Sequence, residues 1–195
     1  TTPLTVLDIA KKIRKKFETP LVVLTYYNLI YRRGLRDFMR LADTCGVDGL
    51  IVPDLPVEEA VDYKSAADAR GVDTVFLAAP STSPQRLERI IDHTSGFLYV
   101  VSLFGVTGAR EKVENSTKKM IAEFTPHTKG RIPIAVGFGV SKPEHVSTLV
   151  RAGADGAIVG SAFVDAIQAN IQNMRTISNM LERMACRLKR STVHQ

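Results

Sequence analysis

Apolar and polar positions follow one another in regular blocks along the chain. Residues 4–17 carry apolar side chains at nearly helical spacing after Thr2-Pro3, which suits an N-cap followed by proline at the first helical position. Residues 20–26 then form an apolar run without alternation, as expected for a strand that is covered on both faces. The same order recurs, with predicted helices at 35–45, 57–70, 84–92, 110–124, 142–152 and 161–186 and predicted strands at 49–53, 74–78, 97–102, 132–136 and 156–159.

A short motif marks three of the predicted helix-to-strand junctions. It reads Gly46-Val47-Asp48, Gly71-Val72-Asp73 and Gly153-Ala154-Asp155. Each glycine is a natural helix C-cap, because it adopts the left-handed conformation without steric cost. Strand and helix recur together about every 25 residues, which predicts parallel strands joined by helices. Such units close most simply into an eight-stranded TIM barrel.

The number of predicted strands is smaller than a complete barrel requires. Six strands are predicted where a (β/α)8 barrel has eight, and the chain opens with a helix and without methionine. We therefore expect residues 1–195 to form a single partial TIM-barrel domain that contains strands 3–8, with about 75 residues of the first two βα units absent. An open six-stranded sheet is the alternative, but it would leave two apolar edge strands exposed to pairing and aggregation.

Composition places the chain among ordinary globular proteins. Of 195 residues, 45% are hydrophobic and 24% are charged, which suffices for one sizeable core. The sequence contains no apolar run long enough to span a bilayer and no signal peptide, and Cys45 and Cys186 lie far apart, so we expect a cytoplasmic protein with reduced thiols and no membrane contact. The net charge of +6 is explained by solvated helix faces, and no nucleic-acid-binding pattern accompanies it.

Three glycine turns follow predicted strands and supply the main candidate chemistry. They are Gly105-Val106-Thr107-Gly108, Gly137-Phe138-Gly139 and Gly160-Ser161. Glycine lets a backbone approach a ligand closely, and the amides at the start of a helix favour an anion. Because parallel strands deliver their carboxyl ends to one rim of a barrel, the three turns predict a single site for a phosphorylated substrate.

Other kinds of site find no support in the sequence. The four histidines are scattered and show no metal-ligand spacing. Neither a GxSxG nucleophile elbow nor a phosphate-binding lysine loop occurs. We therefore expect no metal site, and the family resemblance described next implies a reaction without an organic cofactor.

Six short motifs follow one another along nearly the whole chain. They are Thr25-Tyr26-Tyr27-Asn28, residues 49–56 (GLIVPDLP), Phe76-Leu77-Ala78-Ala79-Pro80, residues 105–110 (GVTGAR), residues 137–141 (GFGVS) and Gly160-Ser161-Ala162. In their order and spacing, these motifs resemble those of the tryptophan synthase alpha subunit. Six ordered motifs make a chance resemblance improbable, although any one of them alone would be weak.

The resemblance implies an activity, a partner and roles for particular residues. The activity is the retro-aldol cleavage of indole-3-glycerol phosphate to indole and glyceraldehyde 3-phosphate, a lyase reaction of tryptophan biosynthesis. Indole then passes to a beta subunit in a heterotetramer. By position in the motifs, the phosphate would be held by Thr107, Gly108, Phe138, Gly139, Gly160 and Ser161.

Four further residues receive roles from the same resemblance. Tyr26 and Tyr99 would line the indole pocket, with Tyr99 a possible auxiliary to the reaction, while Asp54 and Pro56 would meet the beta subunit. Ordinary barrel packing is the alternative role for both tyrosines. For Asp54 the alternative is an N-cap of the helix predicted to begin near Val57.

The two catalytic carboxyl groups of the family have no match in this sequence. The resemblance places that glutamate and aspartate before Thr1, so we assign no catalytic residue here and expect the chain alone to lack lyase activity. Two alternatives remain at this point. One is another phosphate-binding barrel enzyme of the phosphoribosylanthranilate isomerase type, and the other is a non-catalytic scaffold that binds and activates a beta subunit.

Overall fold

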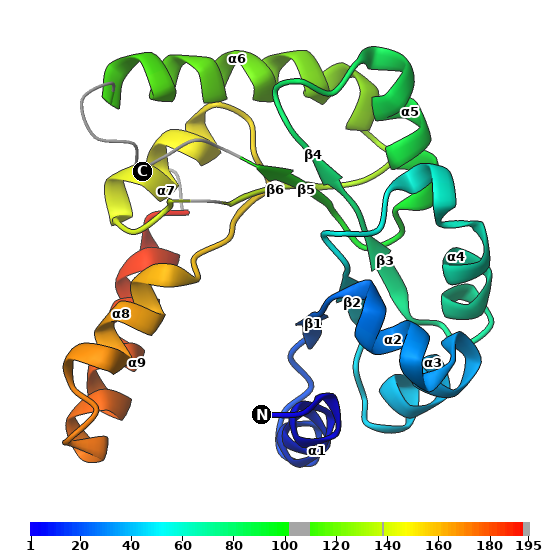
Figure 1. Ribbon diagram of the computed structural model, residues 1–195. Coiled ribbons are helices and arrows are strands. Elements are labelled where there is room, and N and C mark those ends of the chain that lie inside the picture. The colour runs from blue at the N-terminus through cyan, green and yellow to red at the C-terminus, as the bar shows by residue number, and fades with distance from the viewer. Residues whose placement is uncertain (102–109, 138, 193–195) are drawn as a thin grey trace. The chain divides into compact units, whose positions relative to one another are not determined.

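Strands and helices alternate along the chain, as the hydrophobic pattern predicts. A computed structural model describes residues 1–101, 110–137 and 139–192 (Figure 1). The helices are α1 (Pro3–Arg14), α2 (Tyr27–Arg33), α3 (Leu35–Thr44), the 3-10 helix η1 (Val57–Glu59), α4 (Val61–Asp68), α5 (Pro84–His93), α6 (Arg110–Thr128), α7 (Pro143–Arg151), α8 (Ser161–Ala169) and α9 (Met174–Arg190). The strands are β1 (Val22–Leu24), β2 (Gly49–Ile51), β3 (Asp73–Val75), β4 (Leu77–Ala78), β5 (Leu98–Val101), β6 (Ile134–Gly137) and β7 (Gly156–Ala157).

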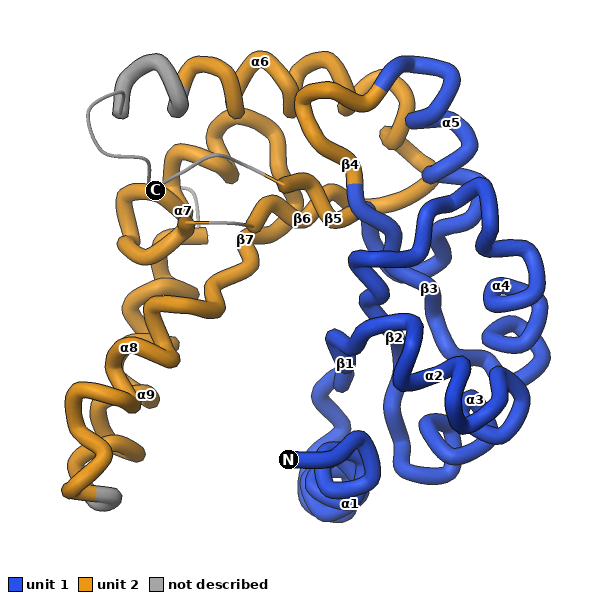
Figure 2. Tube along the Cα trace, viewed as in Figure 1, with its two compact units in different colours: residues 1–77, 83–98 blue, residues 78–82, 99–195 orange. Residues whose placement is uncertain are grey.

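The chain divides into two compact units, which are described separately. Unit 1 comprises residues 1–77 and 83–98, and unit 2 comprises residues 78–82 and 99–195 (Figure 2). The single-domain organisation stays a prediction.

Unit 1 is built on a parallel sheet in the order β1-β2-β3. Val22 pairs with Gly49, and Gly49 pairs in turn with Asp73, so the three strands run in step. The central strand is buried throughout, as expected for a parallel strand between two neighbours. Helices α3 and α4 pack beside each other and contribute the buried side chains of Phe38, Met39 and Tyr63 to the core.

Unit 2 contains most of a second sheet, in the order β4-β5-β6-β7, in which β6 and β7 are parallel. Its core includes Val100 of β5, Ile134 and Val136 of β6, and Leu149 of α7, all of which are buried. Because β6 and β7 are paired and parallel, the turns that follow them are neighbours.

The Gly-x-Asp motif performs the same local task in both units. Gly46, Gly71 and Gly153 have φ values of 75°, 65° and 105°, which confirms the predicted need for glycine at these helix ends. The aspartates have a role that the sequence did not reveal. The carboxylate of Asp48 accepts a hydrogen bond from the amide of Leu21 at 2.6 Å, and that of Asp155 accepts one from the amide of Ile134 at 2.8 Å. Each aspartate thus ties its own strand to the start of the neighbouring one.

Three predicted elements are interrupted in the structure. The strand expected at 74–78 is divided at Phe76 into β3 and β4, which belong to different sheets. The buried Phe76 ring lies between them and meets the rings of Tyr63 and His93 edge-on. The helix expected at 57–70 is divided into η1 and α4.

The long last helix is also divided, into α8 and α9. Asn173 caps α9, because its side chain accepts a hydrogen bond from the amide of Thr176 at 3.2 Å. The side chain of Asn170 donates back to the carbonyl of Ala166 at 2.9 Å, at the end of α8. Asparagine competes with the helix for backbone hydrogen bonds, which explains an interruption between these two residues.

Candidate functional site

Two of the predicted glycine turns lie at adjacent strand ends in unit 2. Ala135 of β6 pairs with Gly156 of β7, and the amide of Ile158 donates to the carbonyl of Val136 at 2.8 Å. Both strands run in the same direction, so the chain leaves them on the same side of the sheet. The turns that contain Gly139 and Gly160 therefore begin next to each other. Gly139 has a φ of 75°, a conformation that other residues adopt only with strain.

Helix α8 starts within the second of these turns and leaves room for a ligand. Gly160 is its N-cap and Ser161 its first residue, and no side chain of the described residues caps this end by a hydrogen bond. A Cβ atom placed on Gly160 would meet no atom of the described structure within 4 Å. Open space in front of a helix start is the arrangement that favours an anion, because the first-turn amides point toward it and the helix dipole is positive there.

The ring of Tyr99 packs beside the turn that begins at Gly137. The residue lies on β5 with only 9% of its surface exposed. A Cβ atom on Gly137 would overlap the Tyr99 hydroxyl and would lie 2.7 Å from its Cζ atom, so the ring packs directly on the end of β6. Burial raises the pKa of the Tyr99 hydroxyl. At neutral pH the hydroxyl is therefore protonated and can donate a hydrogen bond.

Three of the predicted phosphate-site residues lie outside the part that the structure describes. They are Thr107 and Gly108, in the gap at 102–109, and Phe138, between the two glycines of its turn. Their placement in the site stays a prediction.

Tyr26 belongs to unit 1, where it is the N-cap of α2 and 58% exposed. Its side chain makes no capping hydrogen bond. Instead, the first amide of the helix, that of Tyr27, donates to both carboxylate oxygens of Asp54, at 2.9 and 3.1 Å. Asp54 therefore supports the start of α2, and not the helix near Val57, whose N-cap is Pro56. Asp54 is exposed and Pro56 is half-buried, so both remain accessible at the surface of unit 1.

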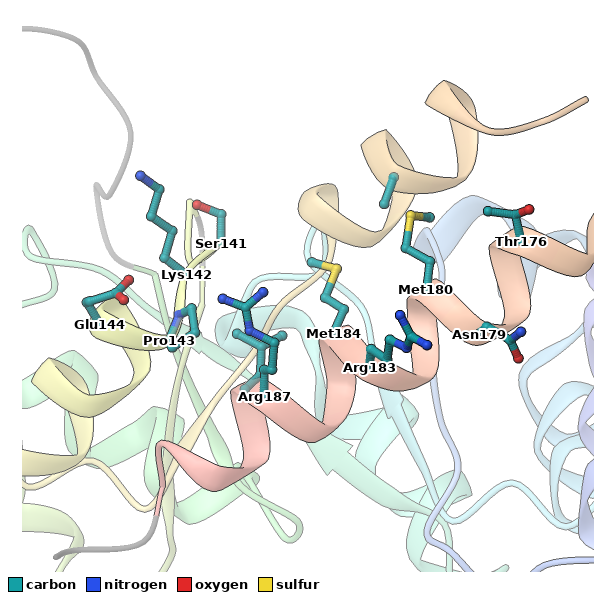
Figure 3. Close-up of a pocket in the computed structure, with 12 residues that line it drawn as sticks. Ser141, Lys142, Pro143, Glu144, Thr176, Asn179, Met180, Arg183, Met184 and Arg187 are labelled. Atoms are coloured by element: carbon teal, nitrogen blue, oxygen red, sulfur yellow. The ribbon is translucent and has the colours of Figure 1, made fainter. Parts of the chain in front are cut away.

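A hollow of about 960 Å³ lies between α7, α8 and α9 in unit 2 (Figure 3). Among the described residues that line it, Lys142, Arg183 and Arg187 are positively charged and Glu144 supplies the one carboxylate. Met180 and Met184 form an apolar middle section on α9. Ser141, two residues after Gly139, lies at one end of the hollow, so an electropositive surface begins close to the glycine turns.

The described residues contain neither a membrane-spanning helix nor a cluster of metal ligands. Within residues 1–101, 110–137 and 139–192, no helix is both long and apolar enough to cross a membrane. Over the same ranges, no three residues among His, Cys, Asp and Glu are grouped closely enough to hold a metal ion.

Known proteins resemble this chain over almost its whole length. A sequence model of the family described as "Tryptophan synthase alpha chain" matches residues 1–193. The tryptophan synthase alpha chain of Methanoregula boonei is 44% identical over 191 residues, which are 98% of this chain and 71% of the relative. That of Pyrococcus furiosus is 47% identical over 159 residues, which are 82% of this chain and 63% of the relative.

A solved structure gives the same result for the fold. The chain from the tryptophan synthase a2b2 complex of Pyrococcus furiosus aligns with a TM-score of 0.87 at 41% identity. The alignment covers 96% of this chain and 74% of that one, so the relatives contain additional residues that have no counterpart here. The predicted fold class, a (β/α)8 barrel represented by part of its units, is confirmed, and the isomerase alternative loses its support. The match of both sequence and fold shows that the chain belongs to the tryptophan synthase alpha chain family.

Proposed function

We propose that this chain supplies the phosphate end and part of the indole pocket of an alpha subunit that cleaves indole-3-glycerol phosphate. The observation that carries the proposal is the pair of turns at the ends of β6 and β7, with the open start of α8 at Gly160 and Tyr99 packed beside Gly137. Thr107, Gly108 and Phe138 are proposed to complete the phosphate contacts with Gly139 and Ser161. Charge-assisted hydrogen bonds contribute about 1.5–3 kcal/mol each, so several amides and hydroxyls suffice without a lysine.

The chemistry divides into binding, which this chain would perform, and proton transfer, which it would not. Cleavage requires one carboxyl group to move a proton between a glycerol hydroxyl and C3 of indole and a second to stabilise positive charge on the indole nitrogen. The resemblance assigns neither group to this chain. The buried Tyr99 hydroxyl is protonated at neutral pH, as any tyrosine is, and burial raises its pKa further; it would orient the substrate by donating a hydrogen bond. Tyr26 is proposed to contact the indole ring.

Asp54 and Pro56 are proposed to meet a tryptophan synthase beta subunit, which would receive the indole. Asp54 is exposed and Pro56 is half-buried on unit 1, which suits such a contact, and the amide of Tyr27 donates hydrogen bonds to the Asp54 carboxylate. The solved relative is part of an a2b2 complex, and we propose the same assembly for the whole protein. We also propose a cytoplasmic location.

Binding of glycerol phosphate to the 195-residue chain tests the phosphate site. We expect Gly160→Asp to weaken binding at least tenfold, because a carboxylate would occupy the open space and repel the anion. Gln168→Asp is the matched control, since it adds the same charge to an exposed position near the other end of α8. Isothermal titration calorimetry of the three proteins measures the difference. Equal affinity of wild type and Gly160→Asp would refute the site.

A separate assay tests whether this chain binds the substrate without carrying out proton transfer. The chain alone should not convert indole-3-glycerol phosphate to indole. Robust turnover by this polypeptide would show that the catalytic acids are supplied from within it, and the assignment of binding without proton transfer would then be wrong.

A further inference from the structure

The hollow between α7, α8 and α9 has an apolar stripe along one side (Figure 3). Met180, Met184 and Leu188 line it at intervals of four residues, so they follow one another along one face of α9. Both methionines are half-buried and Leu188 is buried, which leaves apolar surface within reach of a partner. From Thr176 to Leu188 the lining face of α9 rises about 18 Å. The hollow is therefore long enough to receive about three turns of a helix.

Three exposed cations accompany the apolar stripe. Arg183 and Arg187 each lie three residues after a methionine of the stripe, and Lys142 is the N-cap of α7. In the part of the chain that the structure describes, none of the three forms an ion pair. Glu144 is the one carboxylate among the described lining residues, so positive charge is in excess. Arginine presents a planar fork of donors that suits a carboxylate, and the hollow therefore favours an acidic partner.

Charge and apolar surface together select the occupant. A purely apolar covering would bury the cations without partners, which is unfavourable. A nucleic acid would meet the cations but not the methionines, and none of the described lining residues is an aromatic on which a base could stack. Two copies of the chain joined through this surface would bring their cations together. A helix with one apolar and one acidic face matches both parts of the hollow.

We propose that the hollow between α7, α8 and α9 docks an acidic amphipathic α-helix of a partner protein. The apolar side chains of that helix pack on Met180 and Met184, whose unbranched thioethers adapt to different partners. Its carboxylates pair with the arginines of α9 and with Lys142. All the lining residues belong to unit 2, and the inference does not depend on the phosphate site.

A synthetic helical peptide of about fifteen residues tests the proposal. The peptide carries leucine along one face, glutamate on both sides of that face, alanine elsewhere and a fluorescent label. Titrated with the 195-residue chain at low salt, it should bind with one-to-one stoichiometry and a Kd of about 0.1 mM or tighter by fluorescence anisotropy. The same peptide with glutamine in place of every glutamate is the control and should bind about tenfold more weakly. Absence of binding by the glutamate peptide, or equal binding of the two peptides, would overturn the proposal.

Variants of the lining residues locate the bound peptide. Arg183→Gln and Arg187→Gln should each weaken binding of the glutamate peptide about fivefold, as expected for an exposed ion pair. Met180→Glu should weaken binding further, because it places a negative charge in the apolar stripe. Arg151→Gln is the matched control, since Arg151 is exposed at the other end of α7, and it should bind as wild type does. Circular dichroism verifies that the variants are folded. Equal binding by wild type and both arginine variants of α9 would refute the site.

Two other occupants would give different results. A dimer of the chain alone that Met180→Glu dissociates, measured by sedimentation equilibrium, would assign the hollow to a second copy. A single-stranded DNA of about fifteen nucleotides that binds more tightly than the glutamate peptide, and is weakened by Arg187→Gln, would assign it to a nucleic acid. Either result would overturn the proposal.

Discussion

Gly137 ends β6 and Gly160 lies in the turn after the neighbouring strand β7, yet the absence of a side chain serves a different purpose at each. At Gly137 the space of a side chain is occupied by the ring of Tyr99. At Gly160 the corresponding space contains no atom of the described structure within 4 Å. One glycine therefore permits internal packing and the other leaves room for something outside the chain. A glycine pattern in a sequence cannot distinguish these cases, since it reports only that a side chain is missing.

The largest expected effect on stability follows from filling the packed position. Gly137→Ala would place a methyl group on the Tyr99 ring, which is buried and has little room to move. Overpacking of this kind costs about 1–3 kcal/mol, and we expect a loss near the upper end. Urea unfolding followed by circular dichroism measures the change. Gly160→Ala is the matched control and should cost less than about 1 kcal/mol.

A second substitution, at Tyr99, shows whether packing or backbone strain causes the loss of stability in Gly137→Ala. If the ring of Tyr99 is the cause, Tyr99→Leu should recover part of the stability that Gly137→Ala loses. The expected coupling is about 1–2 kcal/mol in a double-mutant cycle. If the losses of stability from Gly137→Ala and Tyr99→Leu simply add, the Tyr99 ring is not the reason that position 137 requires glycine.

Gly139 provides an intermediate case, in which glycine is needed for its backbone conformation. Its φ of 75° lies in the left-handed region, where a Cβ atom is disfavoured by about 1–2 kcal/mol. Gly139→Ala should therefore destabilise the protein by that amount, whereas Gly139→Asn should cost less, because asparagine tolerates this conformation. Thermal unfolding of both variants tests the point, and an equal loss in the two would contradict it.

The smallest change in stability is expected at Ser161, beside the open position. Ser161 is exposed at the first position of α8, so Ser161→Ala should alter the free energy of unfolding by no more than about 0.5 kcal/mol. Affinity for glycerol phosphate should nevertheless fall about tenfold, because a hydrogen bond to a charged group is worth about 1.5 kcal/mol or more. Ser147→Ala, on α7, serves as the control, and a loss of affinity shared by both variants would not support a phosphate contact at Ser161.

Much of the fold could be read from local sequence patterns. The six apolar runs correspond to the strands, and the glycines at 46, 71 and 153 have the positive φ expected of helix ends. The interruptions were missed, since the division at Phe76 separates two sheets and depends on residues distant in sequence. The roles of Asp48 and Asp155 were missed for the same reason, because each carboxylate binds the amide of a neighbouring strand.

The candidate site was partly predictable. Gly139, Gly160 and Ser161 could be named because glycine after an apolar run is a local signal, and the register of β6 with β7 explains how their turns come together. The contact between Tyr99 and Gly137 has no such signal. The electropositive hollow beside α9 was also missed, because it requires Lys142 to lie on an element that faces Arg183 and Arg187 of α9 (Figure 3).

The sequence by itself determined the family, the alternation of strands and helices and the positions of the glycine turns, because these depend on neighbouring residues and on motif order. The tertiary structure decided which glycine is filled and which is open, because that depends on side chains from other strands. It likewise decided that the apolar strand β1 lies at an edge, since a strand's sequence specifies its preference for burial but not the neighbours it obtains.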